Sequence, residues 1–501
     1  MSEISSPNPR ITVAMIVRDA EHDLVESIRS VAGLTDEIVV CDTGSIDGTV
    51  QIAEQLATRV VHHIWEDDFA AARNECLEHC TGDWILWLDV GESLAEESAL
   101  PLREFVNLHA SPNTAYMLAI KLPPQNVNTA GEQVGRLRLI PNHTAIRFQG
   151  RVRETVDTSL AAAGMEIEDL ACDVWRRPAE HSQQVRVRKA KRNLQLAQSE
   201  MDDNGVSARM LTCLADAYAM LGEKTKSAEY CRMALAHAEP HSTEMLEAYF
   251  GLLTALDGSA GAVSAQTAVC LEALEAFPLD VQLLCAMGGY MQQHGRPDLA
   301  VRSYEVAYRN GQIDPEAWHL QNIVDFAATC FAASLQMSDR TDEALAILEE
   351  AVMGSNPSPQ IRRHLIDLYI KMLRQEDAVR QVDQLPPDTP DREALRSAVR
   401  GASLAAKKNW IAARSYLEAA FDAGCRDPLC LRWSAVTAIA LGNFGRAASA
   451  LEEWRFAGPV TEEIEQFEQV LSQAMSNRRV DGAEQGQTPT PTHATVGAES
   501  L

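Results

Sequence analysis

The sequence lacks an excess of positive charge. Its 501 residues include 44 Lys and Arg against 71 Asp and Glu, which gives a formal net charge of −27. Contacts with nucleic-acid phosphates need clustered cations, so this balance argues against a general nucleic-acid-binding surface. An anionic substrate would need a local basic pocket.

The sequence also lacks metal-type cysteine spacing and long apolar runs. Its 11 cysteines are scattered, odd in number and without paired C-x-x-C spacing. They fit small apolar core residues of a reducing compartment better than a zinc site. No run reaches the ~18 apolar residues of a membrane span, and the first ten residues contain no apolar signal-peptide segment. We therefore expect a cytoplasmic protein without a transmembrane segment, or one held peripherally at the inner face of a membrane.

The length and a hydrophobic content of 46% predict two to four globular domains, at ~150 residues each. In the first part of the chain, continuous apolar runs rich in β-formers predict buried strands. A helical pattern over residues 21–32 separates the first two strands, and this order predicts a βαβ unit. The predicted strands are residues 11–17, 37–41, 60–64, 84–88, 116–122 and 133–140.

Acidic residues follow two of these strands. Asp42 ends the second strand, and the following turn contains Gly44 and Ser45. Asp89 ends the fourth strand, with Glu92 three residues later. Ligands of open α/β sheets bind outside the carboxyl ends of the strands, so these residues predict a binding edge. The alternative is an ordinary capped loop, because Asp, Gly and Ser are common loop residues.

A helix is expected to begin at Asp67 or Asp68, either of which can cap it. Arg73 would then lie in the first turns, where it could point back at the binding edge. Glu154 ends a polar loop that follows the last predicted strand. It is a candidate general base, in competition with Asp67, Asp68 and Glu92, and the alternative is a solvated loop residue.

In this order, the segments resemble the family-2 glycosyltransferases of GT-A fold, in the bacterial branch that includes lipopolysaccharide-core and some peptide glycosyltransferases. The resemblance covers about the first 155 residues. It implies a GT-A-like α/β domain over residues 1–180 with a Rossmann-like mixed sheet. The matching segments are residues 15–18, 36–45, 47–49, 69–74 and 82–89.

The resemblance also implies a function and a set of site residues. The domain would be a hexosyltransferase that moves a sugar from a UDP-linked or related nucleotide-sugar donor, with inversion, to a glycan, lipid precursor or peptide acceptor. Asp89 and Glu154 would be catalytic, and Asp89 and Glu92 would hold Mg²⁺ or Mn²⁺ against the diphosphate. The implied nucleotide-sugar-binding residues are Val17, Asp42, Gly44, Ser45, Arg73, Asp89 and Arg153.

The sequence departs from the family pattern at the implied metal site. Gly91 replaces the aspartate that is normally the direct metal ligand, Arg153 replaces a histidine, and Arg176 and Arg177 lie where a His-x-Gly-Tyr segment is usual. One hypothesis is that a guanidinium from Arg153, Arg176 or Arg177 replaces the metal and makes transfer metal-independent. The other is that the domain is a degenerate pseudoenzyme that serves as an interaction scaffold.

From about residue 185 the pattern is helical, with no convincing strand. Small residues recur with separations of 44, 34, 35 and 34, and a period of 34 is the tetratricopeptide signature. We predict six or seven degenerate units over residues 185–475, with a longer loop around residues 311–318 and a disordered tail over residues 476–501. The array would form a groove for a protein partner, or would only pack against the first domain. The recurring residues are Ala300, Ala344, Ala378, Ala413 and Ala447.

Overall fold

The computed structural model describes residues 8–124, 130–177, 183–258, 261–354, 357–385, 389, 392–457 and 462–484. The chain divides into two compact units. Unit 1 contains Met1–Pro123, Ala130–Arg296 and Arg309–Ile323, and unit 2 contains Pro124–Thr129, Pro297–Tyr308 and Val324–Leu501. The unit boundary therefore differs from the predicted domain boundary near residue 180, because the first helices of the repeat region belong to unit 1.

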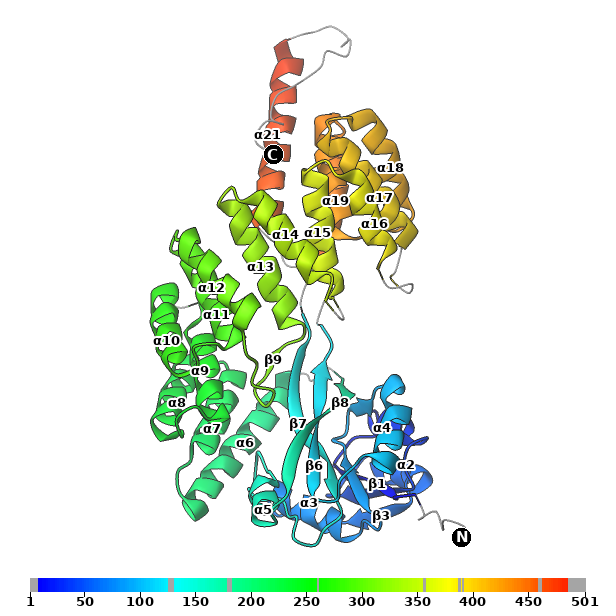
Figure 1. Cartoon of the computed structure of the whole chain (residues 1–501), viewed down its shortest axis with the longest axis vertical. Helices are drawn as coiled ribbons and strands as arrows, with labels where there is room; N and C mark the ends of the chain where they lie inside the picture. The colour runs from blue at the N-terminus through cyan, green and yellow to red at the C-terminus, as the bar shows by residue number, and fades with distance from the viewer. Residues whose placement is uncertain are drawn as a thin grey trace. The chain divides into compact units, whose positions relative to one another are not determined.

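Within the described residues, unit 1 is built on a nine-stranded mixed sheet with the order β3-β2-β1-β4-β7-β6-β8-β5, and β9 pairs with β7 (Figure 1). Strands β1 to β4 are parallel, whereas β7 is antiparallel to both β4 and β6. The strands are β1 (Ile11–Val17), β2 (Glu37–Asp42), β3 (Arg59–His62), β4 (Trp84–Trp87), β5 (Glu92–Leu94), β6 (Thr114–Leu122), β7 (Glu132–Pro141), β8 (Glu166–Arg176) and β9 (His319–Leu320).

Helices cover both faces of the sheet because successive strand residues point to opposite sides. Val13 and Met15 pack in a core with α1, α2 and α4, whereas Ala14 packs in a second core with α3 and α5. The result is an α/β/α arrangement, in which the predicted βαβ unit is confirmed. The helices are α1 (Leu24–Val31), α2 (Thr49–Leu56), α3 (Phe69–Glu78), α4 (Glu96–Leu108) and α5 (Asp157–Ala162).

All six predicted strands are present, with ends that differ by up to two residues. The prediction missed β5, β8 and β9. Strand β8 is mostly exposed over its first residues and is rich in Glu and Asp, so it has no apolar run. Strand β9 has only two residues, and it contradicts the expectation that no strand follows residue 185.

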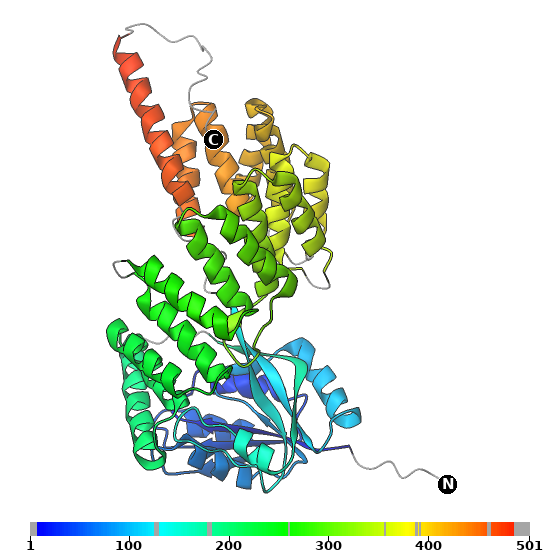
Figure 2. The same cartoon turned by 60° about the vertical axis from the view of Figure 1, so that its left-hand side comes forward.

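The rest of unit 1 consists of helices that follow one another along the chain (Figure 2, teal to green). They are α6 (Gln183–Asn204), α7 (Ala208–Met220), α8 (Lys224–His237), α9 (Thr243–Leu256), α10 (Ala262–Ala276) and α11 (Val281–Gln293). The predicted long loop lies between α12 and β9.

Unit 2 is formed by the later helices of the array. They are α12 (Pro297–Asn310), α13 (Ile323–Met337), α14 (Thr341–Ala351), α15 (Pro359–Lys371), α16 (Gln375–Asp383), α17 (Arg392–Ala406), α18 (Trp410–Asp422), α19 (Pro428–Ala440), α20 (Phe444–Ala457) and α21 (Glu462–Glu484). Helix α21 shows that the prediction of a disordered tail was wrong for residues 476–484, and residues 485–501 lie outside the described residues.

The five recurring alanines occupy equivalent positions in alternate helices. Each lies three residues after the first residue of α12, α14, α16, α18 or α20, and each is 0% exposed. Five residues before each alanine, the backbone adopts a positive φ. Gly295 and Gly442 occupy this position at 68° and 69°, and Leu373 occupies it at 62°. The predicted period therefore marks both the helix packing and the turns.

Candidate functional site

The candidate site is centred on Asp89, which follows the buried strand β4. Its side chain is 31% exposed, and Arg73 Nη2 lies 2.9 Å from Oδ1 while Arg138 Nη2 lies 2.8 Å from Oδ2. Trp87 Nε1 also donates to Oδ1 at 3.2 Å, and Arg176 Nη2 lies 3.6 Å from Oδ2. Three guanidinium groups therefore surround one carboxylate.

Strand register explains why these side chains meet. Leu86 of β4 lies opposite Leu139 of β7, which brings Arg138 next to the end of β4. Arg176 of β8 lies directly opposite Glu92 of β5. Oppositely charged residues that face each other across a strand pair stabilise it.

Glu92 is the buried counterpart of Asp89. Its side chain is 0% exposed, and Oε1 accepts hydrogen bonds from Arg138 at 2.8 Å and Arg176 at 2.6 Å. Its Oε2 accepts from the backbone N–H of Asp89 at 3.0 Å, so the acidic turn closes on itself. The intervening Gly91 adopts φ +88°, which glycine accommodates without strain.

These contacts shift the titration of the charged groups. Burial alone would raise the pKa of Asp89, but the charges of Arg138, Arg73 and Arg176 hold it well below its usual value of 3.8. Burial would likewise lower the pKa of Arg138, and the two carboxylates raise it above its usual range. Asp89 is therefore ionised throughout the physiological range.

The metal role implied for Asp89 and Glu92 does not fit this geometry. Three of their four carboxylate oxygens accept hydrogen bonds from arginines, and the remaining Glu92 Oε2 accepts from a backbone N–H. A divalent cation would have to displace these donors, although Mg²⁺ binds through free carboxylate oxygens and phosphates. Within the described residues, no group of three or more His, Cys, Asp or Glu side chains is arranged to hold a metal.

Arg73 links Asp89 to Glu154. Its Nε lies 2.5 Å from Glu154 Oε1, and its guanidinium lies 4.5 Å from the Trp87 ring and 5.0 Å from the Phe148 ring. The capping prediction holds for Asp68, whose carboxylate accepts from the N–H of Ala71 at the start of α3. Glu154 is 10% exposed, so it is not the solvated loop residue of the alternative interpretation.

The turn after β2 lies at the same edge of the sheet. Asp42 accepts hydrogen bonds from the N–H groups of Gly44 and Ser45, both at 3.1 Å, and its side chain is 6% exposed. Val17, which pairs in register with Asp42, accepts from Thr43 through its carbonyl. Strand β1 pairs with both β2 and β4, which brings this turn and Asp89 to the carboxyl ends of neighbouring strands.

Arg153 makes its ion pairs with helices of the array rather than with Asp89 or Glu92. It pairs with Asp216 of α7 at 2.5 Å and Glu247 of α9 at 2.7 Å, and it donates to Thr212. Arg177 pairs with Asp23 and Glu26 near α1. Of the three arginines proposed to replace a metal, Arg176 alone pairs with Asp89 and Glu92 in the described part of the chain.

Sequence reasoning missed the role of Arg138 and the basic face of α6. Arg138 lies within the predicted strand over residues 133–140, but nothing in the sequence assigns it to the site. The local pattern gave no such signal, because an arginine between Leu137 and Leu139 fits the alternation of a strand with one solvent-facing side. For α6, the signal was the basic stretch at residues 186–192 in a strongly acidic chain.

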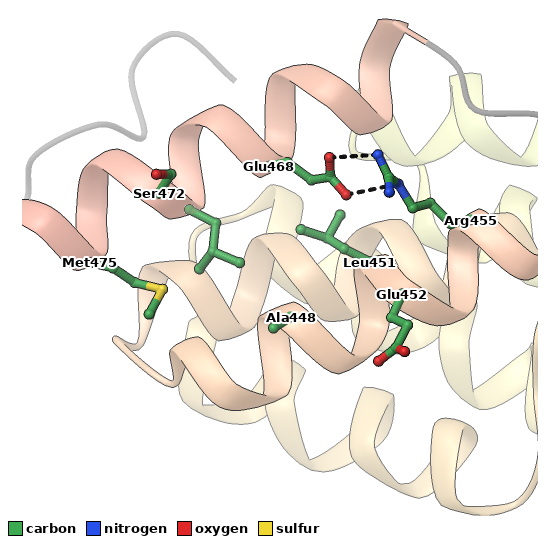
Figure 3. Close-up of a pocket in the computed structure, with 8 residues that line it drawn as sticks. Ala448, Leu451, Glu452, Arg455, Glu468, Ser472 and Met475 are labelled. Atoms are coloured by element: carbon green, nitrogen blue, oxygen red, sulfur yellow. Dashed lines mark hydrogen bonds and ion pairs between the residues drawn. The ribbon is translucent and has the colours of Figure 1, made fainter.

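The helices also form pockets. In unit 1, a cavity of about 580 Å³ is lined by residues of α7, α9 and α11, and by Glu132, Arg153 and Trp318. In unit 2, a cavity of about 400 Å³ lies between α20 and α21, where Ala448 and Leu451 face Ser472 and Met475 (Figure 3). Arg455 pairs with Glu468 beside it at 3.0 Å.

Comparisons with known families match both halves of the chain. Residues 12–112 match Glycosyl transferase family 2, and residues 335–400 match the Tetratricopeptide repeat. No helix in the described part of the chain is long and apolar enough to span a membrane.

Curated relatives resemble parts of the chain. A TPR repeat-containing protein of Synechococcus elongatus is 36% identical over 170 residues, 34% of this chain and 41% of the relative. The putative glycosyltransferase EpsE of Bacillus subtilis is 34% identical over 17% of this chain and 34% of its own length. Glycosyltransferase SunS of Bacillus phage SPbeta is 30% identical over 19% and 22%. The chain thus spans well under half the length of these relatives.

Among solved structures, a tetratricopeptide repeat protein from Parabacteroides merdae is 14% identical and aligns with a TM-score of 0.40. The alignment covers 53% of this chain and 98% of that protein.

Proposed function

We propose that this chain, which joins a family-2 glycosyltransferase domain to tetratricopeptide repeats, transfers a hexose from a UDP-linked or related nucleotide-sugar donor to an acceptor, with inversion. The observation that carries the proposal is the arginine-bound Asp89 at the end of β4, with Glu154 joined to it through Arg73. Open α/β sheets bind nucleotides at this edge.

Each residue has a defined role in this proposal. The turn of Asp42, Gly44 and Ser45 holds the nucleoside, and Arg73 contacts the nucleotide while Asp89 keeps the surrounding guanidinium groups in place. Glu154 takes the proton from the acceptor nucleophile. The nucleophile then bonds to the anomeric carbon as the bond to the diphosphate oxygen breaks, so the nucleoside diphosphate leaves with the bonding electrons.

Guanidinium groups stabilise the departing diphosphate in this scheme, in place of a divalent cation. Arginine suits the role because its planar fork binds phosphate oxygens bidentately. We therefore propose transfer that persists in EDTA. The acceptor class is a glycan, a lipid precursor or a peptide, and the repeats support a role for protein interaction.

Calorimetric titration of UDP and UDP-glucose into the full chain, with EDTA or with Mn²⁺, tests the proposal together with donor turnover. Glu154→Gln should keep donor binding and lower turnover by about 10²–10⁴-fold, the usual contribution of a general base. The control is Glu168→Gln, which makes the same change at an exposed position of β8. A chain that neither binds nor turns over any nucleotide sugar would refute the proposal.

A second candidate is a degenerate domain that acts as an interaction scaffold. It is favoured by the close pairing of Glu154 with Arg73, because a base engaged in an ion pair must be released before it accepts a proton. Donor binding without turnover, for any acceptor presented, would support this candidate. Turnover that disappears in Glu154→Gln would exclude it.

A further inference from the structure

Five cationic side chains form a group whose charges act on one another and on Glu154 of the candidate site. Arg18 follows β1 and Arg176 ends β8, while Arg188, Lys189 and Arg192 come from α6, outside the segment that matches the glycosyltransferase family. We call these five residues the α6 cation cluster. Arg176 is 36% exposed at its side chain, and the other four residues lie at exposed positions, although neighbouring parts of the chain partly desolvate Arg192 and Lys189.

The packing of α6 fixes the cluster beside the site. Leu196 and Ala197 of α6 share an apolar core with Trp65 and Phe69, which flank the start of α3. Arg192, one turn before Leu196, places its guanidinium 4.9 Å from the centre of the Phe69 ring. Helix α3 also carries Arg73 one turn after Phe69. The helix against which α6 packs therefore also supplies a partner of Asp89.

The pKa shifts of Arg192 and Lys189 show that the cations of the cluster repel one another. Partial burial lowers the pKa of Arg192, and the charges of Arg18 and Arg188 lower it further, although Glu154 opposes them. The pKa of Lys189 is lowered by burial and by Arg192, Arg176 and Arg188, against the opposing charge of Asp23. Mutual repulsion of this kind is relieved when an anion binds between the cations.

The charge balance of the site favours such an anion. Asp89, Glu92 and Glu154 each pair with Arg73, Arg138 or Arg176, so Arg18, Arg188 and Arg192 add positive charge to a region whose carboxylates already have arginine partners. A diphosphate supplies negative charge and several acceptor oxygens. Charge-assisted hydrogen bonds from guanidinium groups to phosphate are among the strongest in proteins.

We propose that the α6 cation cluster binds the diphosphate of the donor and that α6, a helix of the appended array, thereby completes the nucleotide site in place of a divalent cation. This inference rests on the proposed function for the identity of the donor. The binding chemistry itself concerns any diphosphate. A consequence is that residues 1–177 alone would hold the donor weakly.

Inorganic pyrophosphate is the probe, because it reports on the cluster whatever the nucleoside. Calorimetry on the full chain in EDTA should detect pyrophosphate and UDP binding, and Arg188→Gln with Arg192→Gln should weaken both at least about tenfold. Lys191→Gln, on the same helix but outside the cluster, is the control and should leave both affinities within about twofold. Circular dichroism of each variant checks that α6 is retained.

The outcomes separate this inference from the proposed function. Weakened pyrophosphate binding without any sugar transfer would support the cluster and count against the function. Transfer and UDP binding that survive in the double variant would overturn the inference and leave the function standing. Pyrophosphate binding that strictly requires Mn²⁺, or that falls equally in Lys191→Gln, would also overturn it.

Discussion

The edge of the sheet around Asp89 and the 34-residue positions of the array bury very different groups. Near Asp89, fully or nearly buried side chains are charged, and each depends on a partner from a distant part of the sequence: Glu92 pairs with Arg138 and Arg176. In the array, the buried positions are alanines that need no partner, only space for a neighbouring helix. Substitutions should therefore destabilise the two regions for different reasons. Near Asp89 they remove the partner of a buried charge, and in the array they fill space that a neighbouring helix needs.

The largest effect is expected for Arg138→Leu. The change leaves Glu92 buried with one fewer cation, and breaking a buried ion pair costs about 3–5 kcal/mol. Hydrogen exchange at the β4 and β7 amides should report this loss as reduced protection. Arg136→Leu, two residues earlier on β7, removes contacts to the carbonyls of Gly135 and Glu316 and should cost about 1 kcal/mol.

A double variant tests whether the unpaired charge of Glu92 causes the loss of protection in Arg138→Leu. Glu92→Gln added to Arg138→Leu removes the uncompensated carboxylate, so it should recover part of the lost protection. If the double variant is as unstable as the sum of the single variants, packing rather than charge dominates at this edge. The contrast between charge compensation near Asp89 and helix packing in the array would then no longer hold.

In the array, Ala447→Leu should cost about 1–3 kcal/mol through overpacking, because Ala447 is 0% exposed between helices. Ala448→Leu makes the same change at the next residue of α20. Ala448 is exposed and lines the pocket of Figure 3, so leucine has room and should be nearly neutral. Urea denaturation with each variant measures the difference, and equal losses would show that the period does not mark close helix packing.

The sequence predicted the parts of this molecule in which local pattern decides structure. Apolar runs identify β1, β2 and β4, and Asp89 follows from the end of such a run. The recurrence of alanine identifies alternate helices of the array, because close helix packing repeats the same steric demand at each unit. Arg73 follows from its position after a helix cap.

Other features depend on pairing between distant segments. Arg138 reaches Asp89 because β7 is antiparallel to β4, and nothing near residue 138 specifies that register. The family resemblance implies that Arg153 binds the nucleotide, yet its carboxylate partners lie 63 and 94 residues later on α7 and α9. Strand β8 is too polar to be identified as a strand without its neighbours.

Asp280 should make the stability of the array depend on pH. It caps α11 by accepting from the N–H of Leu283 at 2.8 Å, and burial raises its pKa from 3.8 to about 6. A raised folded-state pKa means that stability is fully present below the unfolded value and is lost as the pH rises through about 6. Asp280→Asn keeps a good capping residue and should stabilise the chain by about 1–2 kcal/mol at pH 7.5.

The control for Asp280→Asn is the same unfolding measurement at pH 4. At pH 4 the carboxyl group is protonated in the folded chain, so the variant and the original chain should have similar unfolding midpoints. A gain of equal size at both pH values would point to altered capping, and a loss at pH 7.5 would show that the charged form is favoured by contacts of α11.

The smallest expected effect concerns the turns of the array. Leu373 adopts φ +62° at the position that Gly442 occupies in a later unit, and a residue with a Cβ is disfavoured there by about 1 kcal/mol. Leu373→Gly removes this strain but adds freedom to the unfolded chain, so we expect a net stabilisation of roughly 0.5 kcal/mol. Gly442→Leu should have the opposite sign and a magnitude of about 1 kcal/mol. Thermal unfolding of both variants tests the pair. Opposite signs would mean that the turn tolerates many residues at a small cost, whereas the carboxylates near Asp89 do not tolerate the loss of a partner.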